Sequence, residues 1–500
     1  MSRYGNEWDV PKVGMGVGVI AATVGICFLV INFTTGWRMG NALLNLLIGN
    51  WVWMLILTIA IAAIMALFVM EMYGSVIAVT AITFLLLIFV LPSFTYYSAD
   101  VVRLESVSIT EEPSPTYDER AAFPVVKAQI GSAVTINGTL EPSSYIGGKE
   151  FTTLVKRVGW AVGYGQVVVQ TVDITGQAKA RQCAFGDNAQ LAFGNLVFND
   201  LGMEIIGRRP GVIIDEADSY GYCDGDKPVV VIPLKYLSGT WPGVIEVSGG
   251  VAVYDGITGE LTIKDTVKSG EIVGPVYPMS LSSEAYHSTK ASQGYWPWLW
   301  GAAGLTDTSD DEGDPNAGNV GNFHLIRTDG SGGDYVTPLT RVGISTAISG
   351  VGAVSGSETT AGKLNPYVIH TYPDGKVRRA NSALADFIKG SFGTEVPWQN
   401  GSMIFEISPV SQDVWVASIG LNQSIQFRVR SLLDGGVCLE TTGGAKVKCI
   451  LADGTVEGGA QPEPVEPGGP VETTGLEKMT DKEILDLWDA LRAEIEKRMG

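Results

Sequence analysis

Hydrophobic residues are concentrated in three long uncharged stretches near the N-terminus, at residues 13–33, 42–70 and 74–91. A helix needs about 20 apolar residues to cross the hydrocarbon of a bilayer. A helix in the core of a soluble protein keeps a polar face, and these stretches lack one. The pattern therefore predicts an α-helical transmembrane bundle of three spans over residues 1–95, in which residues 13–91 contact membrane lipid.

The pattern changes after residue 95 to short alternating runs that are separated by Gly-rich turns. Residues 251–264 read VAVYDGITGELTIK, and residues 323–339 read FHLIRTDGSGGDYVTPL. Each consists of two alternating arms around a turn, which is typical of a β-hairpin. Residues 367–377 have a Pro-Asp-Gly turn at their centre. We expect a mainly β region that lies outside the membrane.

Length and composition divide the chain further. The β-rich part is longer than a typical single domain, so two domains are expected. A charged, Pro-containing segment precedes them, and a stretch rich in Gly, Pro and Glu follows them, as in a solvated linker. The expected organisation is a membrane anchor (1–95), a stalk (96–124), two β-rich domains (125–275 and 276–453), a flexible linker (454–475) and an amphipathic helix (476–500).

The C-terminal segment carries a helix signal of its own. Thr480 and Glu483 have the spacing of a capping box. Apolar residues then recur at helical spacing along one stripe, at Ile484, Trp488, Leu491 and Ile495. An isolated helix of about 20 residues is marginal in water, so the stripe needs a partner. Residues 480–499 are therefore expected either to self-associate or to dock onto a different protein.

Four of the five cysteines lie beyond the apolar stretches, and an even number is typical of an oxidising compartment. A two-residue turn at Gly443-Gly444 would place Thr442 opposite Ala445 and Cys438 opposite Cys449. Directly opposed strand residues have Cα atoms about 4.5–5.5 Å apart, which is within disulfide range. We expect a Cys438–Cys449 disulfide, with reduced buried thiols as the alternative. Cys183 and Cys223 are then paired by elimination.

Charge indicates the side of the membrane and the class of partner. The three basic residues near the apolar stretches, Arg3, Lys12 and Arg38, favour a cytoplasmic N-terminus and an extracytoplasmic main domain at a cell surface or envelope. Residues 1–95 contain three basic and three acidic side chains, so the net charge of −19 belongs to the rest of the chain. An acidic domain repels phosphate backbones, which argues against nucleic acid as a partner.

Three tryptophans in five residues, Trp296, Trp298 and Trp300, are candidates for stacking on a ligand such as a sugar. They would serve equally well as anchors in the bilayer interface, because indole rings favour the headgroup level. The alternative that we favour is packing within a core or a domain interface.

An acidic run between two expected strands is a candidate cation site. Carboxylate oxygens are the ligands that Ca²⁺ prefers, but the register does not match an EF-hand loop. A solvated acidic loop is the favoured interpretation, and no other cofactor is indicated. The candidate ligands are Asp307, Asp310, Asp311, Glu312 and Asp314.

Signatures of catalysis are absent from the sequence. It contains no G-x-S-x-G, no H-E-x-x-H and no phosphate-binding G-x-x-x-x-G-K-[ST] motif. We therefore expect a non-enzymatic, multi-pass membrane-anchored protein whose β-rich extracytoplasmic domain serves binding or assembly as a structural, oligomer-forming protein. The alternatives are a subunit of a membrane transport or secretion complex and an extracytoplasmic hydrolase of an envelope polymer.

Overall fold

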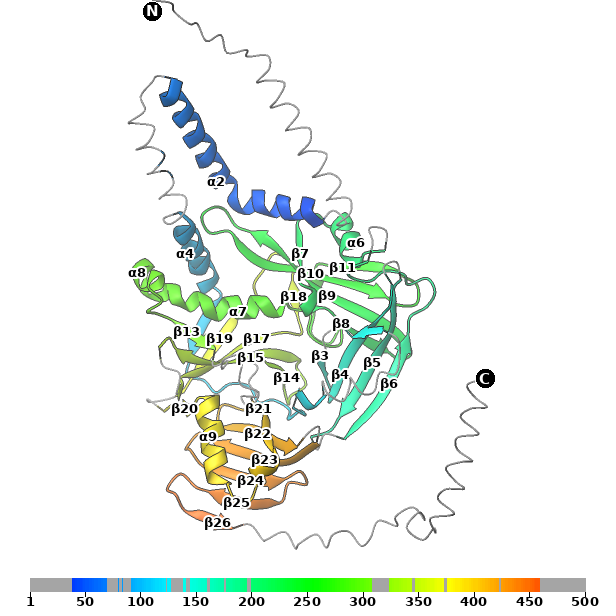
Figure 1. Ribbon diagram of the computed structural model, residues 1–500, viewed down its shortest axis with the longest axis vertical. Helices are drawn as coiled ribbons and strands as arrows, with labels where there is room; N and C mark the ends of the chain where they lie inside the picture. The colour runs from blue at the N-terminus through cyan, green and yellow to red at the C-terminus, as the bar shows by residue number, and fades with distance from the viewer. Residues whose placement is uncertain are drawn as a thin grey trace, which may run out of the picture.

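Strands are the most common element of the described chain, and they form β-sheets that stack along the long axis of the molecule (Figure 1). The structure is a computed structural model. It describes residues 38–69, 80, 83, 91–122, 124–126, 138–140, 144–159, 162–174, 177–195, 199–307, 323–343, 347–372, 376–421 and 424–458.

The first two sheets pack face to face. The first sheet has the order β2-β4-β5-β6, with β3 beside β4, and the second has the order β11-β10-β9-β7, with β8 beside β9. Their shared core contains Leu154 and Val167 from the first sheet, Val230 and Leu234 from the second, and Leu201 from helix α6. The elements are β2 (Gly138–Leu140), β3 (Ser144–Gly147), β4 (Glu150–Arg157), β5 (Tyr164–Val172), β6 (Ala178–Ala184), α6 (Leu201–Arg208), β7 (Val212–Ile214), η2 (Glu216–Asp218), β8 (Tyr220–Asp224), β9 (Lys227–Ser238), β10 (Ile245–Asp255) and β11 (Leu261–Lys264).

The third sheet packs helices against both of its faces. Its order is β1-β19-β17-β15-β13, with β14 beside β15. Tyr335 and Ile369 pack with Leu281 of α7, whereas Val336 and Val351 face Leu384 of α9. The elements are β1 (Val107–Thr110), α7 (Met279–His287), η3 (Ser288–Gln293), α8 (Tyr295–Leu299), β13 (Leu305–Asp307), β14 (Phe323–Ile326), β15 (Gly333–Arg341), β17 (Gly350–Ser355) and β19 (Tyr367–Thr371), with two small pairs, β12 (Thr266–Val267) with β18 (Thr359–Thr360) and β16 (Ala347–Ile348) with β20 (Arg378–Arg379).

The fourth sheet is an antiparallel meander whose six strands pair in chain order. Trp415 is completely buried between this sheet and α9. The guanidinium of Arg378 lies over the Trp415 ring and donates to the carbonyl oxygens of Ser431 and Asp413. The elements are α9 (Asn381–Ser391), η5 (Trp398–Asn400), β21 (Met403–Pro409), β22 (Val414–Leu421), β23 (Ser424–Leu432), β24 (Val437–Thr441), β25 (Lys446–Ile450) and β26 (Val456–Gly458).

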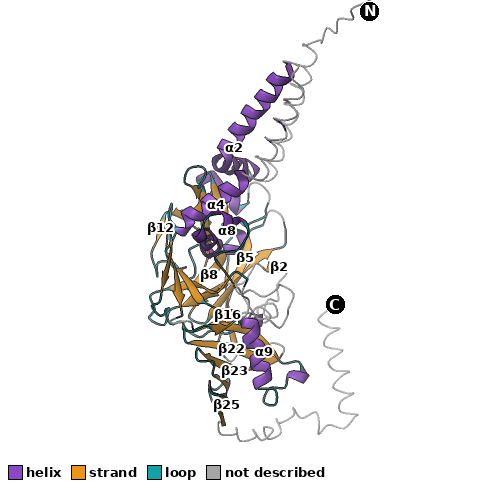
Figure 2. Ribbon diagram, turned by 90° about the vertical axis from the view of Figure 1, so that its left-hand side faces the viewer, coloured by secondary structure: helices purple, strands orange, loops and turns teal. Residues whose placement is uncertain are grey.

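Two helices lie at the end of the molecule opposite to the fourth sheet. They are α2 (Arg38–Val69) and α4 (Leu91–Leu104). Figures 1 and 2 show α2 leaving the β-sheets at this end and pointing away from them.

The three-span bundle predicted for residues 1–95 is wrong as a description of the fold. Among the described residues, no single helix is long and apolar enough to cross a membrane. Span 13–33 lies outside the described residues, as does all of span 74–91 except Thr80, Thr83 and Leu91. The second span falls on α2, where Gly40–Gly49 and Met54–Met65 reach the length and composition of a span only as a pair bent by 79°. The first piece is held against the body by the Asn41 side chain, which is hydrogen-bonded to Gly211 and Val212.

Residues 96–104 of the segment that we expected to form a stalk (96–124) belong to α4, and residues 105–122 are part of the β-sheet body. β1 pairs in parallel with β19, and Tyr117 is almost completely buried. Arg120 forms a buried ion pair with Glu406 of the fourth sheet, with 2.5 Å between Nη2 and Oε1. This segment therefore connects the third sheet to the fourth.

Both hairpins predicted between alternating arms are present. Val251 pairs with Lys264 in β10–β11, and Phe323 pairs with Val336 in β14–β15. The turn expected within residues 367–377 lies outside the described residues, and its two flanking strands belong to different sheets. Sequence alternation therefore identified local pairs but not the partners of every strand.

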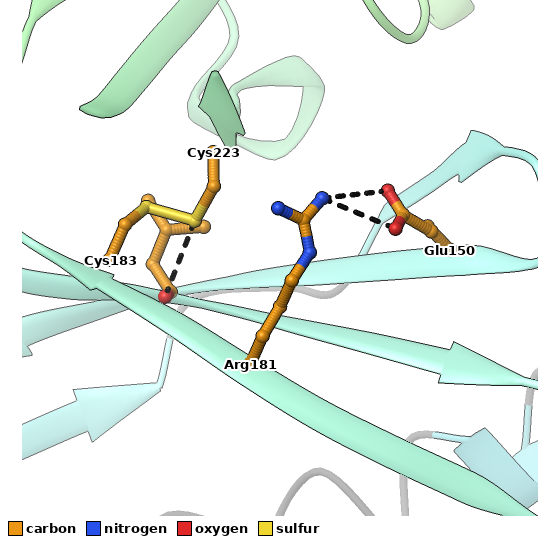
Figure 3. The surroundings of a disulfide bond; sticks show 5 residues. Glu150, Arg181, Cys183 and Cys223 are labelled. Atoms are coloured by element: carbon orange, nitrogen blue, oxygen red, sulfur yellow. Dashed lines mark hydrogen bonds and ion pairs between the residues drawn. A yellow bond between two sulfur atoms is a disulfide. The ribbon is translucent and has the colours of Figure 1, made fainter. Parts of the chain in front are cut away.

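Both disulfides join the cysteines that the sequence pairs. Cys183 of β6 is bonded to Cys223 of β8, so this disulfide joins the first sheet to the second (Figure 3). Arg181, two residues before Cys183, forms a bidentate ion pair with Glu150 at 3.2 Å (Figure 3). Cys438 and Cys449 face each other across β24–β25.

The turn beside the second disulfide differs from the expected one. The Thr441 amide donates to the Ala445 carbonyl, so the loop contains three residues rather than Gly443-Gly444 alone. A β-bulge at Val447 shifts the register by one residue and restores the Cys438–Cys449 pair. The cysteine pairing was therefore predicted correctly from a turn that was one residue too short.

Candidate functional site

The first piece of α2, Gly40–Gly49, is held on the body by asparagine side chains. Asn41 donates from Nδ2 to the Val212 carbonyl at 2.6 Å and accepts from the Gly211 amide at 2.7 Å. The Asn45 Oδ1 atom is also buried. Gly211 and Val212 follow α6, so these contacts fix the helix to the loop before β7.

The second piece of α2, Met54–Met65, exposes apolar side chains over most of its circumference, with a half-buried stripe at Ile56, Ala60 and Ile64. Met54, Leu55, Leu57, Ile59, Ile61 and Met65 are between 39% and 64% exposed. The one polar side chain here, Thr58, donates its hydroxyl to the Met54 carbonyl in its own helix at 2.7 Å. A hydroxyl that is satisfied within its own helix does not require water.

Helix α4 is attached to the body by aromatic contacts with α8. The Trp298 indole donates to the Asp100 carboxylate at 2.7 Å, and the Ser93 and Tyr295 hydroxyls are hydrogen-bonded at 2.6 Å. The Tyr97 ring packs edge-on against both Tyr295 and Trp298.

The three candidate tryptophans differ in how exposed their side chains are. Trp298 is partly buried in the α4 contact, as expected for packing. Trp296 and Trp300 are 66% and 76% exposed, so they remain candidates for stacking or for an interface. Tyr96 of α4 is 67% exposed at the same end of the molecule.

A charged cavity of about 720 Å³ lies beneath these helices. Its wall includes Gly49 of α2, the start of α4, Leu237 and Val244 of the β9–β10 hairpin, and His287 of α7. The interior carries the carboxylates of Asp100, Glu246 and Glu284 together with the Arg103 guanidinium.

Ion pairs connect the carboxylates to bases from several elements. Arg103 of α4 contacts Glu284 of α7 at 2.7 Å and Asp100 at 3.5 Å. The Lys235 ammonium contacts Glu246 across the β9–β10 hairpin and the Ser280 hydroxyl of α7, both at 2.9 Å. The cluster therefore joins α4, α7 and the hairpin.

Burial shifts several of these groups toward their neutral forms. It raises the pKa of Glu284, because the charged carboxylate loses water, although Arg103 opposes the shift. Burial and the neighbouring Asp215 raise the pKa of Asp218, beside Lys235, to about 7. Burial lowers the pKa of His287.

A second cavity, of about 1030 Å³, lies over the third sheet beside η3. Val107, Ile109, Leu305 and Ile369 supply apolar walls, and Arg341 lies at its edge. The cavity is larger than the charged one but lacks a comparable cluster of buried charges.

The acidic run and the C-terminal stripe are mostly beyond the described residues. Asp307 ends β13 and accepts a hydrogen bond from the Tyr286 hydroxyl at 3.2 Å. Asp310, Asp311, Glu312, Asp314 and the stripe Ile484, Trp488, Leu491 and Ile495 lie outside the described residues. Within the part of the chain that the structure describes, no group of three or more His, Cys, Asp or Glu side chains could hold a metal ion.

Two histidines have roles in packing. His324 is paired through Nδ1 with the Tyr145 carbonyl at 2.9 Å, and burial lowers its pKa to about 4. His370 is paired in the same way with the Glu112 carbonyl at 2.9 Å.

Sequence reasoning missed the polar contacts that organise this end of the molecule. Asn41 and Asn45, four residues apart in an apolar run, were the available signal for a helix with one polar side. The pairing of Arg103 with Glu284 had no signal, because the two residues are far apart in the chain.

No protein family model, no curated protein and no solved structure matches this chain.

Proposed function

We propose that this protein is attached to a membrane and presents its β-sheet body in an oxidising compartment for binding or assembly, without an enzymatic activity. The observation that carries the proposal is the second piece of α2, which exposes apolar side chains over most of its circumference while it points away from the body.

The cost of leaving this surface in water supports lipid contact. Full burial of a Leu, Ile or Met side chain contributes about 1.5–3 kcal/mol. Six such side chains in Met54–Met65 are roughly half exposed, so moving them into lipid contributes on the order of 5–10 kcal/mol. Exposed Trp296, Trp300 and Tyr96 at the same end suit the headgroup level.

The disulfides support the oxidising compartment, because thiols stay reduced in the cytosol of most organisms. With the main domain extracytoplasmic, the acidic net charge of −19 favours neutral or basic protein surfaces as partners over nucleic acid. Residues 480–499 offer an apolar stripe for such a partner or for a second copy.

The charged cavity favours binding or assembly over hydrolysis. A glycoside hydrolase needs one carboxyl that can donate a proton and another that can act as base or nucleophile. Asp100, Glu246 and Glu284 are instead paired with Arg103 and Lys235, in an arrangement that fixes α4 to the body.

The test is photocrosslinking of the full-length protein in native membranes that contain a phospholipid with a diazirine in its acyl chain. We expect the protein in the membrane fraction and crosslinks within residues 54–65. Ile257, which is 43% exposed in the body, is the matched apolar control and is expected to stay unlabelled. Recovery of the protein in the supernatant without detergent, or equal labelling at both sites, would contradict the proposal.

A further inference from the structure

The two sides of the first piece of α2 are reversed relative to a helix on a protein surface. Its polar residues, Asn41 and Asn45, point toward the body. Leu43, Leu46 and Leu47 are 43%, 49% and 40% exposed. At 100° per residue these leucines lie opposite the asparagines, while Leu44 and Ile48 lie nearer to the asparagine side and are 38% and 43% exposed. A surface helix in water normally buries its apolar side and exposes its polar side.

Hydrogen bonding explains why Asn41 faces inward. The backbone amide of Gly211 and the carbonyl of Val212 both find their partner in the Asn41 side chain. An unpaired buried backbone group would be costly, so these bonds fix the rotation of the helix about its axis. The rotation leaves the leucines on the outer side.

Resting on the membrane attachment proposed above, we propose that Gly40–Gly49 lies in the plane of the bilayer surface, with Leu43, Leu46 and Leu47 inserted at the boundary between headgroups and acyl chains. A helix with one apolar and one polar side adopts this orientation at a membrane interface. Here the polar side is covered by the protein's own backbone rather than by water.

Two observations favour lipid as the occupant of the leucine surface. The helix continues directly into Met54–Met65, whose exposed apolar surface requires the same environment. The two pieces meet at 79°, so the second piece can point nearly along the bilayer normal when the first lies along the bilayer surface. Figures 1 and 2 also place α4 and α8, with their exposed aromatic residues, at this end of the body.

This orientation has a consequence for the body. A Cβ atom added to Gly49 would lie 3.4 Å from the Leu237 side chain of the β9–β10 hairpin, so the bend of α2 lies beside the sheets. The body is then held against the membrane surface in a fixed orientation instead of moving on a flexible tether. The charged cavity extends to this bend, because Gly49 is part of its wall.

The experiment places an environment-sensitive fluorophore on a single introduced cysteine, in full-length protein reconstituted into phosphatidylcholine vesicles. The background is Cys27→Ser, because the other four cysteines are paired. Leu47→Cys reports the outer side of the helix. Val456→Cys, which is 57% exposed in β26 at the opposite end of the body, is the matched control.

We expect a lipid with a spin label near its headgroup to quench the Leu47→Cys fluorophore and to leave the Val456→Cys fluorophore unchanged. If the vesicles carry the protein but neither site is quenched, the in-plane orientation is wrong and the attachment stands. If the protein fails to float with the vesicles, the attachment fails as well. If Leu47→Cys emission instead depends on the protein-to-lipid ratio without quenching, a second copy covers the leucines and the inference is overturned.

Discussion

Removal of the Cys183–Cys223 disulfide should destabilise the body more than removal of Cys438–Cys449. Cys183–Cys223 closes a loop with a sequence separation of 40 and joins two sheets, whereas Cys438–Cys449 closes one of 11 within a single hairpin. Chain-entropy arguments give about 4 kcal/mol for the longer loop and about 3 kcal/mol for the shorter one. The difference, about 1 kcal/mol, is the quantity to be measured.

The assay is urea unfolding of detergent-solubilised full-length protein and of two double variants, Cys183→Ala/Cys223→Ala and Cys438→Ala/Cys449→Ala. Cys183, Cys223 and Cys449 are buried and Cys438 is half-buried, so the cavity left by alanine adds to the loop effect in the first variant. We expect a lower urea midpoint for both variants, with the larger shift for the first. An equal or larger shift for the hairpin variant would refute the loop argument. Free thiols at either pair in non-reducing peptide mapping would refute the pairing itself.

Three further changes test the packing and the charged groups. Burial lowers the pKa of His324 from 6.5 to about 4, so the unfolded chain binds the proton first and the body should lose up to about 3 kcal/mol of stability as pH falls from 6.5 to 4. His324→Gln should remove this pH dependence of stability from melting curves recorded at several pH values. An unchanged pH dependence would refute the assignment to His324. The raised pKa of Asp218 changes stability with pH in the opposite direction, because the folded state binds the proton first. Stability should fall as pH rises from about 4 to about 7, and Asp218→Asn should abolish this loss. Arg120→Met should lower the free energy of unfolding by about 3–5 kcal/mol, because it removes the Arg120 guanidinium from the buried Glu406 carboxylate. The double variant Arg120→Met/Glu406→Leu should recover most of this loss in urea titrations. Failure of the double variant to recover would show that the ion pair itself is stabilising.

The cysteine pair in the last hairpin shows what local sequence can determine. The spacing of Cys438 and Cys449 around a Gly-Gly pair was sufficient to place the two residues opposite each other. The bulge at Val447 was not predictable, because a one-residue shift depends on how the side chains pack on the sheet rather than on the turn residues alone.

The segment between α4 and the first sheet shows the opposite case. Its charges and prolines resemble a stalk, yet Tyr117 and Arg120 are buried. β1 pairs with β19, from which it is separated by more than 250 residues of chain. The sequence does not show which distant strand a given strand pairs with. The alternation of apolar and polar residues in a strand shows only which of its two sides is buried.

The sequence by itself determined the local elements of this protein: alternating arms that form hairpins, cysteines that can face each other, and an apolar run that forms a helix. These features depend on side-chain periodicity within a few residues of chain. The tertiary structure alone decided that the two pieces of α2 meet at 79° and that the first lies against the body, where Asn41 contacts the backbone of Gly211 and Val212. It also decided that Arg103, Glu284 and Lys235 form one cluster, since Coulombic contacts form between residues that folding brings together, whatever their distance along the chain.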